Sequence, residues 1–98
     1  MVKITLRKRP YLHLAAIGHA GAAPHGEDLV CAGISTLLCT LAAQLELAGC
    51  SSTARLEPGY ADLRAERSRS SLAAFSFAET GLQMLAMQYP QYVCIEER

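Results

Sequence analysis

The chain has 98 residues, of which 51% are hydrophobic and 18% charged, and nine basic side chains balance nine acidic ones. A chain of this length forms one domain, residues 1–98, which buries roughly 60 to 65% of its unfolded surface and so has a modest core. A neutral charge balance without a basic stripe argues against nucleic acid as a direct partner.

The N-terminus does not follow the pattern of a signal peptide, because its basic residues come after the first apolar residues rather than before them. The apolar stretch Leu29–Ala48 is interrupted by polar side chains, so we expect a buried helix and no membrane contact. Four cysteines without a Cys-x-x-Cys pair indicate free thiols. We therefore expect a cytoplasmic protein.

The first part of the chain predicts two antiparallel strands. Val2–Arg7 alternates apolar and polar side chains, and the turn at Lys8–Pro10 leads into a second strand, Tyr11–Ile17. Residues Ala20–Glu27 include two glycines and a proline, so they form a loop.

A long helix follows the loop. Asp28 is a good N-cap, and apolar residues recur every three or four positions up to about Ala48, after which Gly49 suits the helix end. The predicted buried stripe is Val30, Ile34, Leu37, Leu41, Leu45 and Ala48.

The second half predicts a hairpin, a helix and a last strand. Ser51–Glu57 and Tyr60–Arg64 flank the turn dipeptide Pro58-Gly59. After a polar connector, Glu66–Ser71, we expect a helix from about Leu72, capped by Ser70 or Ser71 and stopped by Pro90, and then a short strand at Tyr92–Ile95. The order ββαββαβ favours an α+β fold in which two helices pack on one face of a mixed, mostly antiparallel sheet.

Two short motifs flank the loop, Gly18-His19-Ala20-Gly21 before it and Asp28-Leu29-Val30-Cys31-Ala32 after it. If Asp28 caps the helix, Cys31 lies in the first turn, where unpaired N–H groups and the helix dipole favour a thiolate. His19 is then the candidate general base, and first-turn N–H groups are candidate oxyanion donors. Cys31 would otherwise be a small core residue.

Other residues near Cys31 each have two possible roles or belong to the loop. Asp28 is either a plain cap or a residue that orients the catalytic groups, and Ser35, one turn beyond Cys31, either supports the thiol or bonds its own backbone, which is the favoured alternative. Gly21 and Gly26 give the substrate loop its freedom to move and close over a bound peptide.

A metal site is an alternative, because His13, His19, His25 and Cys31 recur every six residues. That spacing runs through a strand, a loop and a helix, and no closely spaced pair helps four ligands converge. We therefore expect no metal and no cofactor.

The paired motifs resemble those of the ribosomal-processing cysteine protease family, Prp, and the resemblance extends over nearly the whole chain. It implies a homodimeric cysteine endopeptidase with Cys31 as nucleophile. It also implies the substrate, the N-terminal extension of the twenty-seventh protein of the large ribosomal subunit. Gly33 stands where the family is expected to have alanine. A glycine within a helix makes the helix less rigid but does not change the expected chemistry.

Two other classes of function remain open from the sequence. One is a ribosome-assembly binding module without catalysis, in which Cys31 belongs to the core. The other is a thiol redox or acyl-transfer enzyme that uses the same thiolate.

Overall fold

The computed structural model describes residues 1–21 and 28–98. Its elements are β1 (Val2–Arg7), β2 (Leu12–Ile17), α1 (Leu29–Leu47), β3 (Ser52–Glu57), β4 (Tyr60–Ala65), α2 (Arg69–Gln88) and β5 (Val93–Glu97). This order confirms the predicted ββαββαβ arrangement.

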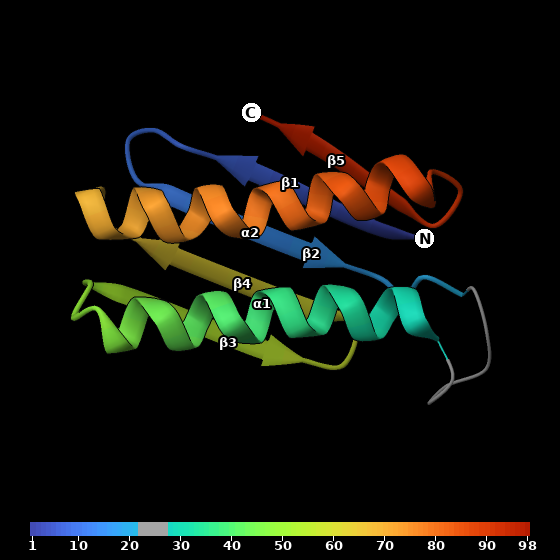
Figure 1. Cartoon of the computed structure of the whole chain (residues 1–98), viewed down its shortest axis with the longest axis horizontal. Helices are drawn as coiled ribbons and strands as arrows, with labels where there is room; N and C mark the ends of the chain where they lie inside the picture. The colour runs from blue at the N-terminus through green and yellow to red at the C-terminus, as the bar shows by residue number, and fades with distance from the viewer. Residues whose placement is uncertain (22–27) are drawn as a thin grey trace.

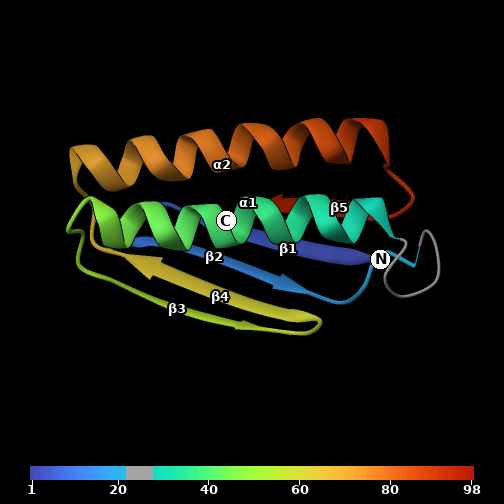
Figure 2. The same ribbon diagram turned by 60° about the horizontal axis from the view of Figure 1, so that its bottom comes forward.

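The five strands form one sheet in the order β3-β4-β2-β1-β5 (Figures 1 and 2). All neighbouring pairs are antiparallel except β1 and β5, which are parallel. The sheet is therefore mixed and mostly antiparallel, as predicted.

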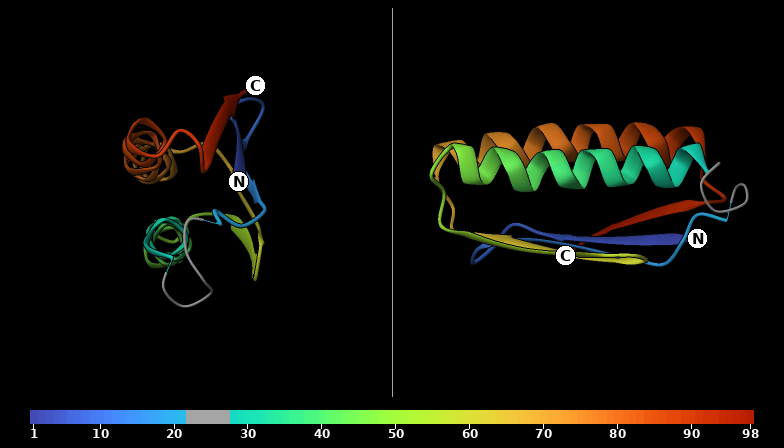
Figure 3. Two further views of the ribbon diagram at one scale, coloured as in Figure 1. Left: turned by 90° about the vertical axis from the view of Figure 1, so that its right-hand side faces the viewer. Right: turned by 90° about the horizontal axis from the view of Figure 1, so that it is seen from below.

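Both helices cover the same face of the sheet, and within residues 1–21 and 28–98 no helix lies on the other face (Figure 3). Period-two alternation explains this, because one set of strand side chains points to the helices and the other set points away. The set that faces the helices is apolar and buried: Val2, Ile4, Leu6, Leu12, Leu14, Ala16, Ala61, Leu63, Ala65 and Val93.

The helices run antiparallel (Figure 1). They meet through two reciprocal leucine–glycine contacts. A Cβ placed on Gly33 of α1 would lie 3.4 Å from Leu85 Cδ1 of α2, and one placed on Gly81 of α2 would lie 2.7 Å from Leu37 Cδ2 of α1. Leu37 therefore packs against α2, while Leu38 is one of the buried residues of α1. The predicted α1 stripe was wrong at Leu37, because α2 as well as the sheet covers the helix, and at Ala48, which is the exposed C-cap.

The start of α2 also differs from the prediction. The N-cap is Ser68, so the helix begins at Arg69 rather than near Leu72, and the connector is correspondingly shorter. Ser71, one of the two predicted caps, lies instead in the first helical turn and is completely buried. Its hydroxyl accepts from Ser68 N–H at 2.8 Å and donates to Glu66 O at 2.7 Å, which completes a capping box.

Strand ends follow their sheet neighbours rather than side-chain polarity. β5 continues past the predicted end at Ile95, through Glu96 and Glu97, because it pairs with β1 as far as Leu6.

α1 is long and apolar enough to cross a membrane by length and composition alone, but core helices of soluble proteins share these properties. Here Val30, Ile34, Leu38, Leu41 and Leu45 are buried.

Candidate active site

Three segments of the chain meet at one end of the molecule. The end of β2, the start of α1 and the β3–β4 turn lie together there (Figure 1). They enclose an open cavity of about 570 Å³, and its lining includes His19, Cys31, Ser35, Leu38, Leu56 and Gly59. The cavity therefore joins both predicted motifs to a hairpin that the sequence had not linked to them.

Cys31 occupies the first turn of α1 and is half-buried. The predicted N-cap is confirmed, because Asp28 has an extended backbone and its Oδ1 accepts the Cys31 N–H at 3.0 Å. Asp28 O accepts the Ala32 N–H, also at 3.0 Å, which is the first backbone bond of the helix. The Cys31 N–H, one of the candidate oxyanion donors, is therefore already bonded to Asp28.

The sulfur of Cys31 accepts a hydrogen bond from a donor that the sequence did not reveal. The backbone N–H of Ala20 donates to Cys31 Sγ at 3.2 Å. Ala20 is buried, and it directly follows His19 in the Gly-His-Ala-Gly motif. A backbone donor has no side-chain signature, so only its place beside His19 hinted at this contact.

His19 lies just beyond the end of β2, where the chain turns at Gly18, whose φ is +106°. Gly18 N–H donates to Gly59 O at 2.9 Å, which joins this corner to the β3–β4 turn. The imidazole lies against Gly59, and a Cβ built there would be 2.7 Å from His19 Nε2. Across the described residues, no hydrogen bond joins the His19 ring to Cys31 Sγ, although both side chains line the same cavity.

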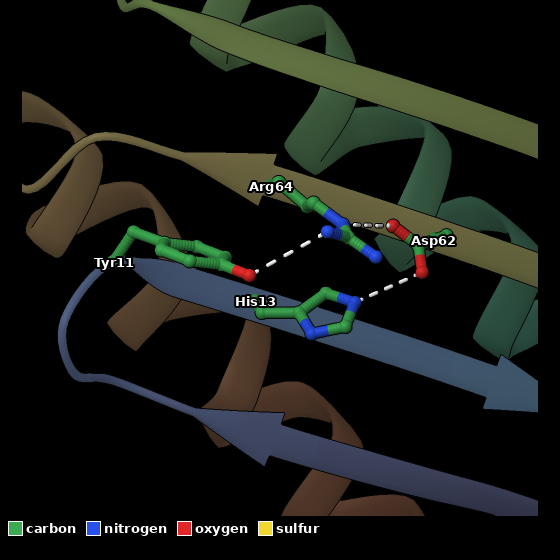
Figure 4. Close-up of polar contacts among 4 residues, drawn as sticks. All are labelled: Tyr11, His13, Asp62 and Arg64. Carbon is green, nitrogen blue, oxygen red and sulfur yellow. Dashed lines mark hydrogen bonds and ion pairs between the residues drawn. The ribbon is translucent and has the colours of Figure 1, made fainter.

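His13 belongs to the helix-free face of the sheet, away from Cys31. Its Nε2 lies 2.9 Å from Asp62 Oδ2, and Arg64 Nε donates to Asp62 Oδ1 at 2.9 Å (Figure 4). Burial, the largest single influence, opposes ionisation of Asp62, but the hydrogen bonds from Arg64 and His13 together hold its pKa below 3.8. His13 thus belongs to a polar cluster of its own.

The remaining predicted site residues divide into two groups. Ser35 and Gly21 line the cavity, and so does Cys39, an exposed cysteine that the sequence had not assigned to the site. Gly26 and His25 lie outside the described residues. Within the described part of the chain, no three His, Cys, Asp or Glu side chains are grouped so as to hold a metal ion.

Comparison with known proteins identifies the family. A family model described as cysteine protease Prp matches residues 1–94. The chain also resembles the solved structure of SMU.848 from Streptococcus mutans, with 26% identity, a TM-score of 0.75, and coverage of 100% of this chain and 96% of that one. No curated protein matches the chain.

Two structures of the essential ribosomal processing protease Prp from S. aureus share the fold. One holds a covalently linked product peptide and matches with a TM-score of 0.90 and 17% identity. The other holds a substrate peptide and matches with a TM-score of 0.80 and 16% identity. In both cases the similarity covers 100% of each chain.

Proposed function

The chain belongs to the Prp family of cysteine proteases, and from this premise we propose that Cys31 is its nucleophile and His19 its general base. The observation that carries this proposal is the hydrogen bond from Ala20 N–H to Cys31 Sγ, 3.2 Å long, with His19 as the preceding residue in the same cavity. The N–H group that donates to the sulfur and the candidate base therefore belong to adjacent residues, Ala20 and His19.

The proposed reaction has two steps. In the first, His19 accepts the thiol proton, and Cys31 Sγ attacks the carbonyl carbon of the substrate. His19 then gives the proton to the leaving amine as the C–N bond breaks. In the second step, water attacks the resulting thioester, and the acid product leaves as the Cys31 thiol is restored. Asp28 acts as the helix cap that fixes Cys31, because its Oδ1 is bonded to the Cys31 N–H.

We propose that the substrate is the N-terminal extension of the twenty-seventh protein of the large ribosomal subunit. Three observations support a peptide of this kind: the motifs around Cys31, the Prp family match and the substrate peptide held by the related S. aureus enzyme. The open cavity between α1 and the β3–β4 turn is partly apolar through Leu38 and Leu56, which suits side chains of an extended peptide.

Cleavage of a synthetic precursor peptide, followed by mass spectrometry, tests the proposal. Cys31→Ala should abolish cleavage, whereas Cys94→Ala should keep it within about twofold of wild type, since surface changes outside the site have small effects. Cys94 is the control because it is an exposed free cysteine on β5 and does not line the cavity. Cleavage that survives in Cys31→Ala, or is lost equally in Cys94→Ala, would contradict the assignment.

The histidines provide a second test in the same assay. We expect His19→Ala to lower kcat/KM by at least ~10²-fold, as loss of a general base does, and His13→Ala to lower it less than about tenfold. His13 serves as the control because it is bonded to Asp62 on the helix-free face. A larger loss in His13→Ala than in His19→Ala would show that the base is misassigned.

We also propose that the protein is a homodimer in the cytoplasm. Four free cysteines fit a reducing compartment. The candidate dimer surface is an outer stripe of α2, formed by residues that alternate at spacings of four and three: Ala73, Phe77, Thr80, Met84 and Met87. Phe77, Met84 and Met87 are 77%, 66% and 82% exposed.

This outer stripe is self-complementary. In an antiparallel pair of α2 helices related by a two-fold axis near Thr80 and Gly81, each Phe77 faces the Met84 position of the other copy. The two charged residues of α2 are Arg69 and Glu79, and Lys8 binds Glu79 at 3.0 Å. The outer stripe itself contains no charged residue.

Sedimentation velocity tests the dimer. Phe77→Glu should yield monomers at concentrations where wild type is dimeric, because it puts a charge into the apolar contact. Leu47→Glu is the control, since Leu47 is 83% exposed but lies on α1. A dimer that persists in Phe77→Glu would place the interface elsewhere, and a wild-type monomer would refute the homodimer.

A further inference from the structure

We propose that Gly59 is a positioning residue of the protease: by having no side chain, it leaves the space in which the His19 imidazole is held. This inference rests on the proposed role of His19 as general base. It adds the β3–β4 turn to the catalytic apparatus, although the turn supplies no reacting group.

The evidence is how closely the ring approaches the glycine. A Cβ added to Gly59 would lie 2.7 Å from Nε2, 3.1 Å from Cε1 and 3.4 Å from Cδ2 of His19. Ordinary contact begins at 3.4 Å, so a methyl group would require a displacement of about 0.7 Å at Nε2. Nε2 is the ring atom closest to the added carbon, so the clash falls on a nitrogen that can carry the proton.

The turn itself is held on two sides, so the ring is the part that must move. Gly59 O accepts the Gly18 N–H at 2.9 Å, and Tyr60, the next residue, pairs with Ile17 of β2. His19 is an exposed side chain at the end of its strand, and its ring can rotate away. An added methyl should therefore have a small effect on stability beyond backbone strain and a large effect on the base.

Backbone strain can be separated from the steric effect, because the chain contains a matched control. Gly59 has φ +72° and Gly49, at the end of α1, has φ +71°. Alanine suffers the same left-handed strain at both positions. A Cβ on Gly49 meets nothing within 4 Å, whereas one on Gly59 meets the His19 ring. The difference between the two alanine variants therefore isolates the contact with His19.

The experiment measures kcat and KM for Gly59→Ala and Gly49→Ala on one precursor peptide, together with their unfolding midpoints in urea. We expect similar losses of stability in both variants. We expect kcat of Gly59→Ala to fall at least ~10-fold below that of Gly49→Ala with KM within about threefold, because displacements near 1 Å can reduce rates about 10²-fold. If alanine prevents folding, Gly59→Asn and Gly49→Asn provide the same comparison, since asparagine tolerates positive φ.

A double-mutant cycle shows whether Gly59 acts through His19. Adding Gly59→Ala to His19→Ala should change the residual rate less than about twofold, although the same change reduces the wild-type rate at least ~10-fold. If Gly59→Ala reduces the cleavage rate by the same factor in wild type and in His19→Ala, the inference is refuted. It is also refuted if Gly59→Ala and Gly49→Ala have equal kcat while His19→Ala is inactive. If His19→Ala keeps wild-type activity, the proposed base is wrong and the inference fails with it.

Discussion

Replacing Gly33 or Gly81 by alanine should change stability in opposite directions, although the same substitution is made in the same helix–helix contact. In either helix, alanine favours the helical state by up to about 1 kcal/mol relative to glycine. The difference arises from the leucine that covers each position. The new Cβ at Gly33 would lie 3.4 Å and 3.6 Å from the two methyl groups of Leu85, which is ordinary contact.

At Gly81, the new Cβ would lie 2.7 Å and 3.0 Å from the two methyl groups of Leu37. Overpacking of this kind costs about 1 to 3 kcal/mol, which exceeds the gain in helix propensity. We therefore expect Gly33→Ala to stabilise the protein by about 0.5 to 1 kcal/mol and Gly81→Ala to destabilise it by about 1 kcal/mol.

Urea unfolding followed by circular dichroism, with thermal melts as a second readout, measures both changes. A change of 1 kcal/mol corresponds to about 4 to 8 °C in Tm for a domain of this size. Gly33→Ala should also keep kcat within about twofold of wild type, as expected for a change that touches no group in the reaction. Equal signs for the two variants would refute the packing argument, and a large loss of kcat in Gly33→Ala would show that helix flexibility near Cys31 serves catalysis.

Three further predictions follow from the described contacts. Ser71→Ala should lower the free energy of unfolding by about 1 to 3 kcal/mol, because it leaves Ser68 N–H and Glu66 O without the Ser71 hydroxyl. The control is the exposed neighbour: Ser70→Ala should change the free energy of unfolding by less than about 0.5 kcal/mol in the same urea titration. Asp62→Asn should destabilise the protein by up to about 1 kcal/mol at neutral pH. The pKa of Asp62 is lower in the folded protein than in the unfolded chain, so the stabilisation is present above the unfolded pKa and is lost as pH falls through the folded pKa. The unfolding free energies of wild type and Asp62→Asn should therefore converge in acid. A difference between them that grows below pH 4 would contradict the role of the ionised carboxylate. Cys31 and Cys39 should form no intrahelical disulfide, because eight helical residues separate their Cα atoms by about 12 Å, beyond the ~7 Å limit; mass spectrometry of the oxidised native monomer checks this.

The sequence predicted the parts of the fold that depend on local patterns. Strand alternation, the Asp28 cap and the Pro58-Gly59 turn each follow from residues close together in the chain, and all three occur in the structure. The errors lie where a partner elsewhere in the fold decides the outcome. Leu37 packs on a second helix rather than on the sheet, and β5 is prolonged through charged residues by pairing with β1.

The candidate site shows the same division. Cys31 and His19 could be selected from the sequence, because their motifs flank one loop. Ala20 and Gly59 could not, since a backbone N–H and a missing side chain have no pattern of their own. The approach of Gly59 to His19 depends on a pairing between β2 and β4, whose residues lie more than 40 positions apart. Contacts of that kind become visible only when the sheet order is known.

Site-resolved labelling of the four cysteines by iodoacetamide in the native protein tests the central claim most directly. Cys31 is half-buried, whereas Cys39 and Cys94 are exposed. An activated nucleophile should nevertheless react fastest at Cys31, because thiolate character controls the rate, and this excess should fall at least ~10-fold in His19→Ala but remain in His13→Ala. Rates that simply follow exposure, with Cys39 and Cys94 ahead of Cys31, would contradict the account.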